Sequence, residues 1–371
     1  MALHHTIAWG LFLAIVLILL GIDLFVLHRK PHEIKLKEAF IGAAIPVVAA
    51  SLFAVALAYG YQRHFLDLGV LEPGIAGTKH EEFYPQNGGQ ALLLFSTGYL
   101  VELSLSADNV FLFVILMTFF KVPSIYQHRV LFWGVIGALV MRGIMIIGGG
   151  ALLSRFEWII YIFGAFLVFT GIKMCFSGEP KDPSSTLAVR MARRVFPIHD
   201  GFDGKNFFTT IDGKRYATTL FLVLVCIEFT DLVFALDSIP AIFGITLDPY
   251  IVFTSNVFAI LGLRSMYFLL AGVMDKFHLL KYGLAIVLTF VGVKMLLPML
   301  GVAYGKLTGS EHHWELHNHA VSLGVIAGVL TLSIVGSLIF PSKKHHGNPL
   351  AGDAEGSAHA PKNLSSATPK S

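Results

Sequence analysis

Two apolar stretches of this chain each contain a pair of carboxylates six residues apart. The first stretch contains Glu102 and Asp108, and the second contains Asp231 and Asp237. An acidic side chain at the centre of a bilayer costs about 2.5–3.5 kcal/mol on insertion scales, so such residues are rare and usually mark an ion or proton pathway. The two pairs therefore predict a cation-binding site inside a membrane.

The polar side chains in and around these stretches offer oxygen rather than nitrogen or sulfur. The candidate metal ligands are Glu102, Asp108, Asn109, Glu228, Asp231 and Asp237. Further oxygen donors are Ser104, Ser106, Thr230, Ser238 and Asn256. Such ligands suit Mg²⁺, Ca²⁺ and Mn²⁺ better than zinc or copper. We expect a divalent cation as the transported substrate, with no resident cofactor.

Two arginines near the centres of neighbouring apolar stretches, Arg142 and Arg264, are candidate ion-pair partners of these acids. Five carboxylates and two arginines leave three negative charges in excess if all are ionised. A divalent cation together with a proton would compensate that charge, which favours exchange of metal for protons. The alternative is that the carboxylates are structural and simply pair with the arginines.

Helical periodicity places some of these side chains on one face. Residues seven apart in an α-helix lie about 20° apart around the axis. Glu102 therefore shares a face with Asn109, and Ser106 lies between them. In the second stretch Asp231 shares a face with Ser238 in the same way.

The second acid of each pair lies elsewhere on the helix. Asp108 and Asp237 are about 120° around the axis from the first acid of their stretch. Pro240 lacks an N–H and clashes with the preceding turn, so it could break the second helix. We therefore hypothesise that both acidic helices are locally unwound near their second acid, as in many transporters.

Composition defines the class of protein that must position these residues. Of 371 residues, 55% are hydrophobic and 14% are charged, well below the roughly 25% charged residues of soluble domains. The formal net charge of +3 does not indicate a nucleic-acid partner. Zinc-protease and serine-hydrolase motifs are absent from the sequence, so we expect a transporter rather than an enzyme.

The hydrophobic pattern predicts an all-α polytopic membrane protein with about nine spans, each near the ~20 residues that a bilayer requires. Lys and Arg gather in alternate loops, which predicts an N-out, C-in orientation. The predicted spans are residues 7–27, 39–59, 90–117, 130–152, 156–176, 217–243, 250–273, 279–300 and 319–340.

Spans three to five and six to eight form an internal repeat, A (90–176) and B (217–300). Each copy begins with an acidic span, continues with a central arginine and ends in a similar string, Gly171-Ile-Lys-Met174 or Gly292-Val-Lys-Met295. Three spans is an odd number, so consecutive copies insert in opposite orientations. Inverted repeats of this kind are typical of transporters that bind substrate at the membrane midplane.

The remaining segments have no partner in the repeat. Residues 1–89 are expected to form two peripheral helices and an outer loop, and residues 177–216 a basic cytoplasmic linker with Asp-Gly turn signals. Residues 301–340 hold an outer loop and the ninth helix, and residues 341–371 a disordered tail. His313 and His317 in that outer loop are spaced to bind a metal, but a solvated loop is the preferred interpretation.

The two acidic motifs, at residues 102–110 and 228–241, closely resemble those of the TerC family of bacterial membrane proteins, with Alx-type members as the nearest subgroup. The resemblance covers about residues 7–340. It implies manganese export across the bacterial inner membrane, with the acids of both motifs at the family's functional positions. The family name refers to tellurite resistance. Some relatives are associated with membrane-protein biogenesis, so a membrane assembly or stress-response factor is the alternative function.

Overall fold

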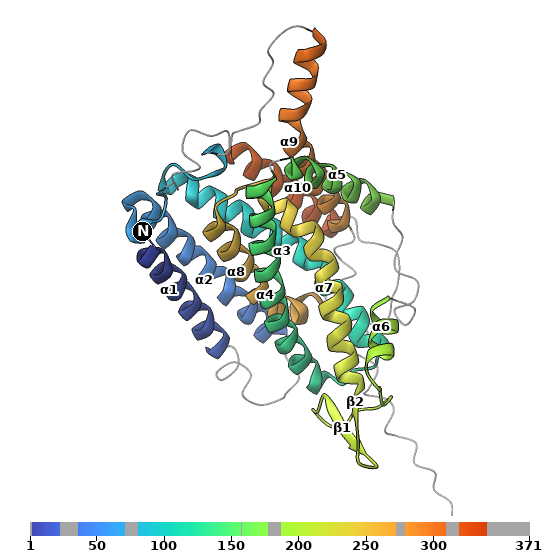
Figure 1. Ribbon diagram of the computed structural model, residues 1–371. Helices are drawn as coiled ribbons and strands as arrows, with labels where there is room; N and C mark the ends of the chain where they lie inside the picture. Colours follow the sequence, from blue (N-terminus) through green and yellow to red (C-terminus); the bar gives the residue numbers. More distant parts are fainter. Residues whose placement is uncertain are drawn as a thin grey trace, which may run out of the picture.

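The computed structural model describes residues 2–22, 36–70, 81–156, 158–176, 187–271, 279–308 and 319–339, and these are almost entirely helical (Figure 1). Within these ranges, nine long helices overlap the nine predicted segments. They are α1 (Ala2–Ile22), α2 (Leu36–Arg63), α3 (Gly88–Phe119), α4 (Ser124–Arg155), α5 (Ile159–Phe176), α7 (Thr219–Phe243), α8 (Pro249–Ala271), α9 (Leu280–Thr308) and α10 (His319–Ile339). Two short 3₁₀ turns, Phe65–Asp67 and Glu81–Phe83, lie between α2 and α3.

Seven of the described helices are long and apolar enough to cross a membrane, namely α2, α4, α5, α7, α8, α9 and α10. In α1 the apolar stretch Thr6–Ile22 is shorter, and α3 is not among the seven. The prediction of a polytopic helical membrane protein is therefore confirmed. Nine spans and an N-out, C-in orientation stay predictions.

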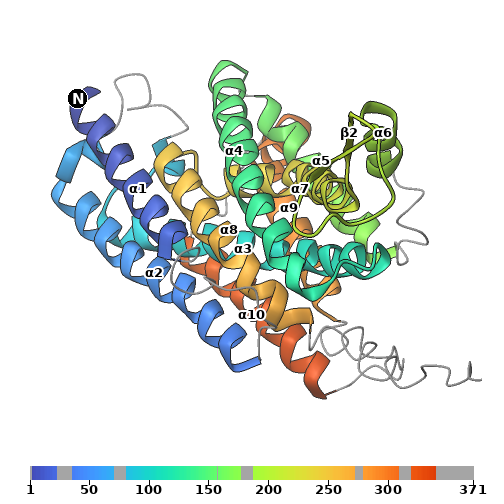
Figure 2. The same cartoon turned by 90° about the horizontal axis from the view of Figure 1, so that it is seen from below.

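The helices that carry the acids and arginines pack against one another at the centre. α3 packs against α8, α4 against α7, and α5 against α9, while α3 also contacts α7 and α4 contacts α8. α1 and α2 lie side by side along one flank, where α2 contacts α3 and α8 (Figures 1 and 2). α10 packs against α3 and α9.

Small residues let α5 and α9 cross closely. A Cβ added to Gly292 would lie 2.6 Å from the carbonyl oxygen of Gly164, and one added to Gly171 would lie 2.7 Å from that of Ala285. Glycine at such a crossing allows two membrane helices to approach backbone to backbone. Gly171 and Gly292 belong to the two similar strings that end the repeats, so the same position of each copy contributes a glycine to this crossing.

Both acidic helices are continuous, so the hypothesis of local unwinding is wrong. α3 runs unbroken through Asp108, and α7 runs unbroken through Asp237 and Pro240. Pro240 lies in the last turn of α7, which ends at Phe243, so its missing N–H removes a hydrogen bond close to the end of the helix. Proline is tolerated in membrane helices where neighbouring groups satisfy the released carbonyl.

The basic linker between the repeats has a structure of its own. Helix α6 (Leu187–Val195) packs against α7, and strands β1 (Phe208–Ile211) and β2 (Lys214–Ala217) form an antiparallel hairpin that projects beyond α7 (Figure 1). Asp212 and Gly213, with φ of 51° and 75°, form the hairpin turn, as the Asp-Gly signal predicts. His313, His317 and the tail 341–371 lie outside the described residues.

Candidate functional site

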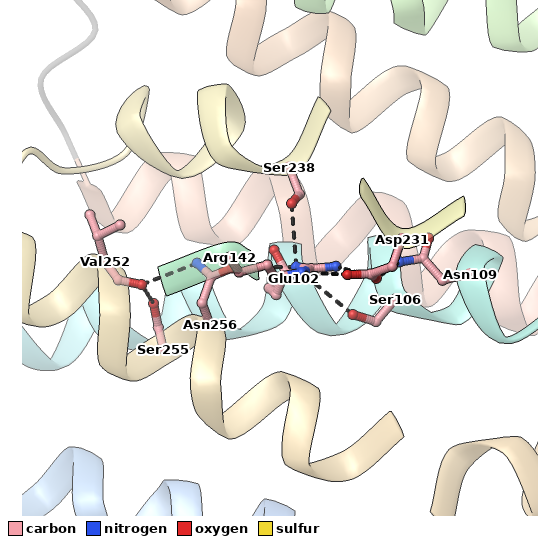
Figure 3. A network of polar contacts seen from close by, with 9 residues as sticks. All are labelled: Glu102, Ser106, Asn109, Arg142, Asp231, Ser238, Val252, Ser255 and Asn256. Atoms are coloured by element: carbon pink, nitrogen blue, oxygen red, sulfur yellow. Dashed lines mark hydrogen bonds and ion pairs between the residues drawn. The ribbon is translucent and has the colours of Figure 1, made fainter. Parts of the chain in front are cut away.

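Arg142 of α4 joins the first acids of the two repeats in a buried ion pair (Figure 3). Its Nε and Nη2 donate to the two carboxylate oxygens of Asp231 on α7, over 3.3 and 3.0 Å. Its Nη1 pairs with Oε1 of Glu102 on α3. Each of the three residues is 1% exposed. A single guanidinium therefore ties α3, α4 and α7 together at the centre of the bundle.

The neighbours of this ion pair confirm the predicted helix faces. On α3, Ser106 donates to Glu102 Oε1 over 3.4 Å, and the Asn109 amide donates to Asp231 Oδ1 over 3.1 Å. On α7, Ser238 accepts from Arg142 Nη1 over 3.4 Å. Ser106 and Asn109, at i+4 and i+7 from Glu102, thus point into the same site as Ser238, at i+7 from Asp231.

Helix α8 contributes a further oxygen ligand to the guanidinium. Arg142 Nη1 donates to Asn256 Oδ1 over 3.4 Å, while the Asn256 amide donates to the carbonyl of Val252 over 3.1 Å. That second hydrogen bond turns the Asn256 oxygen toward Arg142 (Figure 3). The site is therefore built from four helices, α3 and α4 of repeat A and α7 and α8 of repeat B.

Two buried oxygen atoms of the site have no hydrogen-bond partner within the part of the chain that the structure describes. They are Oε2 of Glu102 and Oδ1 of Asn109. A buried acceptor left without a hydrogen bond costs about 1–3 kcal/mol. The guanidinium thus leaves part of the oxygen lining unsatisfied, although it binds both carboxylates.

Glu228 lies near this network but outside its hydrogen bonds. It precedes Asp231 by three residues on α7 and is partly buried. Its carboxylate packs directly against Gly137 of α4, where an added Cβ would overlap it. The lack of a side chain at Gly137 therefore creates the space that Glu228 occupies.

Asp237 faces a different neighbour from Asp231. It is partly buried, accepts a hydrogen bond from Thr170 of α5, and lies near the Lys173 ammonium. This agrees with its predicted position around the axis of an unbroken helix. The side chain of its counterpart Asp108 lies outside the described part of the structure.

The predicted ligand set is thus divided in space. Glu102, Asn109 and Asp231 meet around Arg142, whereas Glu228 and Asp237 contact α4 and α5 separately. Among the described residues, no three His, Cys, Asp or Glu side chains are grouped to hold a metal ion. The structure instead shows one cation, the Arg142 guanidinium, between the two first acids.

Some of the other predicted oxygen donors are used within their own helices. The Ser104 hydroxyl donates to the carbonyl of Leu100, and the Thr230 hydroxyl donates to the carbonyl of Cys226. Sequence reasoning missed Gly137, Thr170 and Lys173 as neighbours of the acids. Lys173 lies in the string that ends repeat A, so its recurrence in repeat B was the signal that could have identified it.

Arg264, the repeat counterpart of Arg142, lies in a different environment. It is 2% exposed and lines a cavity between α8 and the flanking helices α1, α2 and α4. Gly42 and Pro46 of α2 form part of the same cavity. The two arginines thus differ in position although their places in the repeat correspond.

Gly137→Ala tests whether the position of Glu228 matters. The added methyl group must displace the Glu228 carboxylate, and overpacking of this kind costs about 1–3 kcal/mol. We expect a lower melting temperature and reduced transport, measured on the purified protein and on reconstituted vesicles. Gly134→Ala is the matched control, because its Cβ would meet Ile227 at an ordinary 3.4 Å. If the two variants had the same melting temperature and the same transport rate, the position of the Glu228 carboxylate against Gly137 would not matter.

Comparison with known proteins places the chain in a family. Residues 87–345 match the family described as "Integral membrane protein TerC family". This range includes both acidic helices, both arginines and the linker. No solved structure matches the chain.

Relatives cover almost the full length. An "Uncharacterized membrane protein STKORF319" of Myxococcus xanthus is 45% identical over 89% of this chain and 92% of its own. A "Putative membrane-bound redox modulator Alx" of Escherichia coli (strain K12) is 43% identical over 88% of this chain and 92% of its own. An "Uncharacterized membrane protein" of Rickettsia bellii is 35% identical over 90% and 97%. The chain belongs to the TerC family of integral membrane proteins.

Proposed function

We propose that this protein exports a hard divalent cation, Mn²⁺ above all, from the cytoplasm across the bacterial inner membrane. The observation that carries the proposal is the buried Glu102–Asp231 pair, one acid from each repeat, within a lining of amide and hydroxyl oxygens. Buried carboxylates in a membrane are costly and mark ion pathways. Manganese in particular is what the resemblance in the acidic motifs implies.

The packing of the helices supports an inverted-repeat transporter. Exchanging α3 with α7, α4 with α8 and α5 with α9 converts the α3–α8 contact into the α7–α4 contact, and both are present. The same exchange leaves the α5–α9 crossing in place. Its two glycine contacts also interchange, because Gly171 meets Ala285 and Gly292 meets Gly164. Such a two-fold relation between repeats is common in transporters that work by alternating access.

The position of the acid pair agrees with that architecture. Glu102 and Asp231 are equivalent in the repeat and lie on α3 and α7, which contact each other. A site at the interface of inverted repeats can be exposed to either side of the membrane by rocking one repeat against the other. Substrate would reach the pair from the cytoplasm and leave it toward the outside, in the predicted N-out, C-in orientation.

Charge balance favours proton exchange as the coupling. Arg142 neutralises only Glu102 and Asp231, so a carboxylate outside that ion pair, such as Glu228, would take up a proton when the metal leaves. Metal release and protonation would then be linked. We expect an imposed pH gradient to drive Mn²⁺ movement into proteoliposomes, and Mn²⁺ flux to change the internal pH. Flux that follows the membrane potential and ignores the pH gradient would indicate uniport and reject exchange.

A second candidate function is a membrane assembly or stress-response factor with structural acids. The observation in its favour is the bidentate hydrogen bonding of Arg142 to Asp231, which is typical of a structural ion pair. Several relatives carry the name of a putative redox modulator. In this chain Cys175 is an exposed free thiol and Cys226 a buried one.

Metal content of cells separates the two functions. In bacteria that lack their own manganese exporter, expression of this protein should lower cytoplasmic manganese and restore growth at high Mn²⁺. A structural factor would leave the manganese content unchanged. Cell manganese measured by elemental analysis, at equal amounts of membrane protein, provides the readout.

A further inference from the structure

The Arg142 guanidinium occupies the position where a cation bound by both repeats would sit. It lies between Glu102 and Asp231, the equivalent acids, and contacts both. It is the only cation that the described residues place between these two acids. The structure therefore shows the acid pair already filled, by a positive charge that belongs to the chain.

The fit of this internal cation is incomplete. Glu102 Oε2 and Asn109 Oδ1 are buried beside it without a hydrogen-bond partner among the described residues. Both are oxygens of the type that hard divalent cations use as ligands. A hard divalent cation takes about six oxygen ligands arranged on all sides, whereas a guanidinium offers five N–H groups in one plane. The lining thus offers oxygens that Arg142 does not engage.

A divalent cation and the guanidinium cannot both occupy the pair. The two carboxylates carry two negative charges, and Arg142 is effectively always protonated. Against these two acids alone, a divalent ion beside it would place three positive charges against two negative ones. Arg142 also contacts Glu102 Oε1 and both oxygens of Asp231, so it must release at least one carboxylate before a metal can bind both acids.

The contacts of Arg142 offer a route for that movement. Nη1 is held at 3.4 Å by the neutral oxygens of Ser238 and Asn256, while Nε and Nη2 hold Asp231. Ser238 and Asn256 lie away from Asp231 in Figure 3. The guanidinium can release Asp231 and keep hydrogen bonds to these two residues.

We propose that Arg142 is a tethered counter-ion that fills the acid pair when no metal is bound and competes with the metal for it. The proposal rests on the proposed function and assigns Arg142 a role within it. Competition weakens metal binding, which helps release on the far side. It also keeps the empty pair neutralised while the repeats change their arrangement.

The test compares Arg142→Gln with Arg264→Gln in the full-length protein. Arg264 is the matched control, because it is the repeat counterpart of Arg142 and is also buried. It lines the cavity between α8 and the helices α1, α2 and α4 rather than contacting the acid pair. Mn²⁺ affinity is measured by the loss of the free Mn²⁺ signal in electron paramagnetic resonance. Melting temperature is measured with and without Mn²⁺.

We expect Arg142→Gln to bind Mn²⁺ at least about tenfold more tightly than the parent, which is 1.4 kcal/mol. Its melting temperature should be lower without metal and should rise more on addition of Mn²⁺ than that of the parent. Its transport should be slower, because the metal is released less readily. Arg264→Gln should keep the parent affinity.

Each contrary outcome has a distinct meaning. If the parent binds Mn²⁺ and Arg142→Gln binds it equally or more weakly, Arg142 does not compete with the metal. The inference about Arg142 is then rejected, while the proposed metal site stands. If neither the parent nor any variant binds Mn²⁺, the metal site itself is rejected. If Arg142→Gln does not accumulate in the membrane, Arg142→Lys is tested instead. Lysine keeps the positive charge but cannot contact both oxygens of Asp231. This variant should then show a smaller gain in affinity, and no gain would overturn the proposal.

Discussion

Asp231→Asn is expected to abolish Mn²⁺ export. The change keeps the shape of the side chain but removes the charge that binds Arg142 through two oxygens. Breaking a buried ion pair costs about 3–5 kcal/mol, so we also expect less protein in the membrane. The Glu102–Arg142 pair remains, which should allow part of the protein to fold. Export normalised to the amount of membrane protein should still be absent.

Asp200→Asn is the matched control for this variant. Asp200 forms a 2.8 Å ion pair with Arg193 in the linker, but its side chain is 71% exposed. Exposed ion pairs contribute about 0–1 kcal/mol, so stability and export should stay at the parent level. If Asp231→Asn and Asp200→Asn showed the same export per amount of membrane protein, the Glu102–Asp231 pair would be structural.

Asp237→Asn is expected to abolish export while leaving the protein amount unchanged. Asp237 is only partly buried and lies outside the Arg142 network, so its charge is not needed to hold α3, α4 and α7 together. Asparagine can still accept the hydrogen bond from Thr170. The expected loss therefore reports on the charge alone. The same loss is expected for Asp108→Asn, at the equivalent repeat position.

Thr170→Val provides the comparison for Asp237. It removes the hydrogen bond to the carboxylate but keeps the charge and a similar volume. We expect a modest decrease in export, measured as manganese content of cells at equal protein amounts. If Asp237→Asn exported manganese as well as the parent, Asp237 would not be part of the ion pathway. An equal loss of export in both variants would point to the α5–α7 contact rather than to the charge.

The sequence was sufficient for the helices and for the faces that meet at the site. Apolar runs located the nine long helices that the structure describes, and the seven-residue spacing placed Asn109 and Ser238 in the site of the first acids. These features depend on local periodicity, which a single sequence contains. The same periodicity placed Asp237 away from Asp231, and an unbroken α7 agrees with it.

The sequence could not show how the site is filled. Both arginines looked alike in the repeat, yet Arg142 joins the two acids while Arg264 lines the cavity beside α2. Residues of α1 and α2, which have no counterpart within the repeats, form part of that cavity. The space for Glu228 depends on Gly137, a contact across helices about ninety residues apart in the chain. Long-range packing of this kind leaves no local pattern.

Mn²⁺ flux into proteoliposomes tests the central claim most directly. Vesicles that contain the purified protein and a metal-sensitive dye would receive external Mn²⁺ under a pH gradient, beside vesicles that contain Asp231→Asn and vesicles without protein. The account predicts rapid Mn²⁺ entry with the parent and only background entry in the other two. Background entry with the parent, or equal entry with parent and variant, would contradict transport through the Glu102–Asp231 pair.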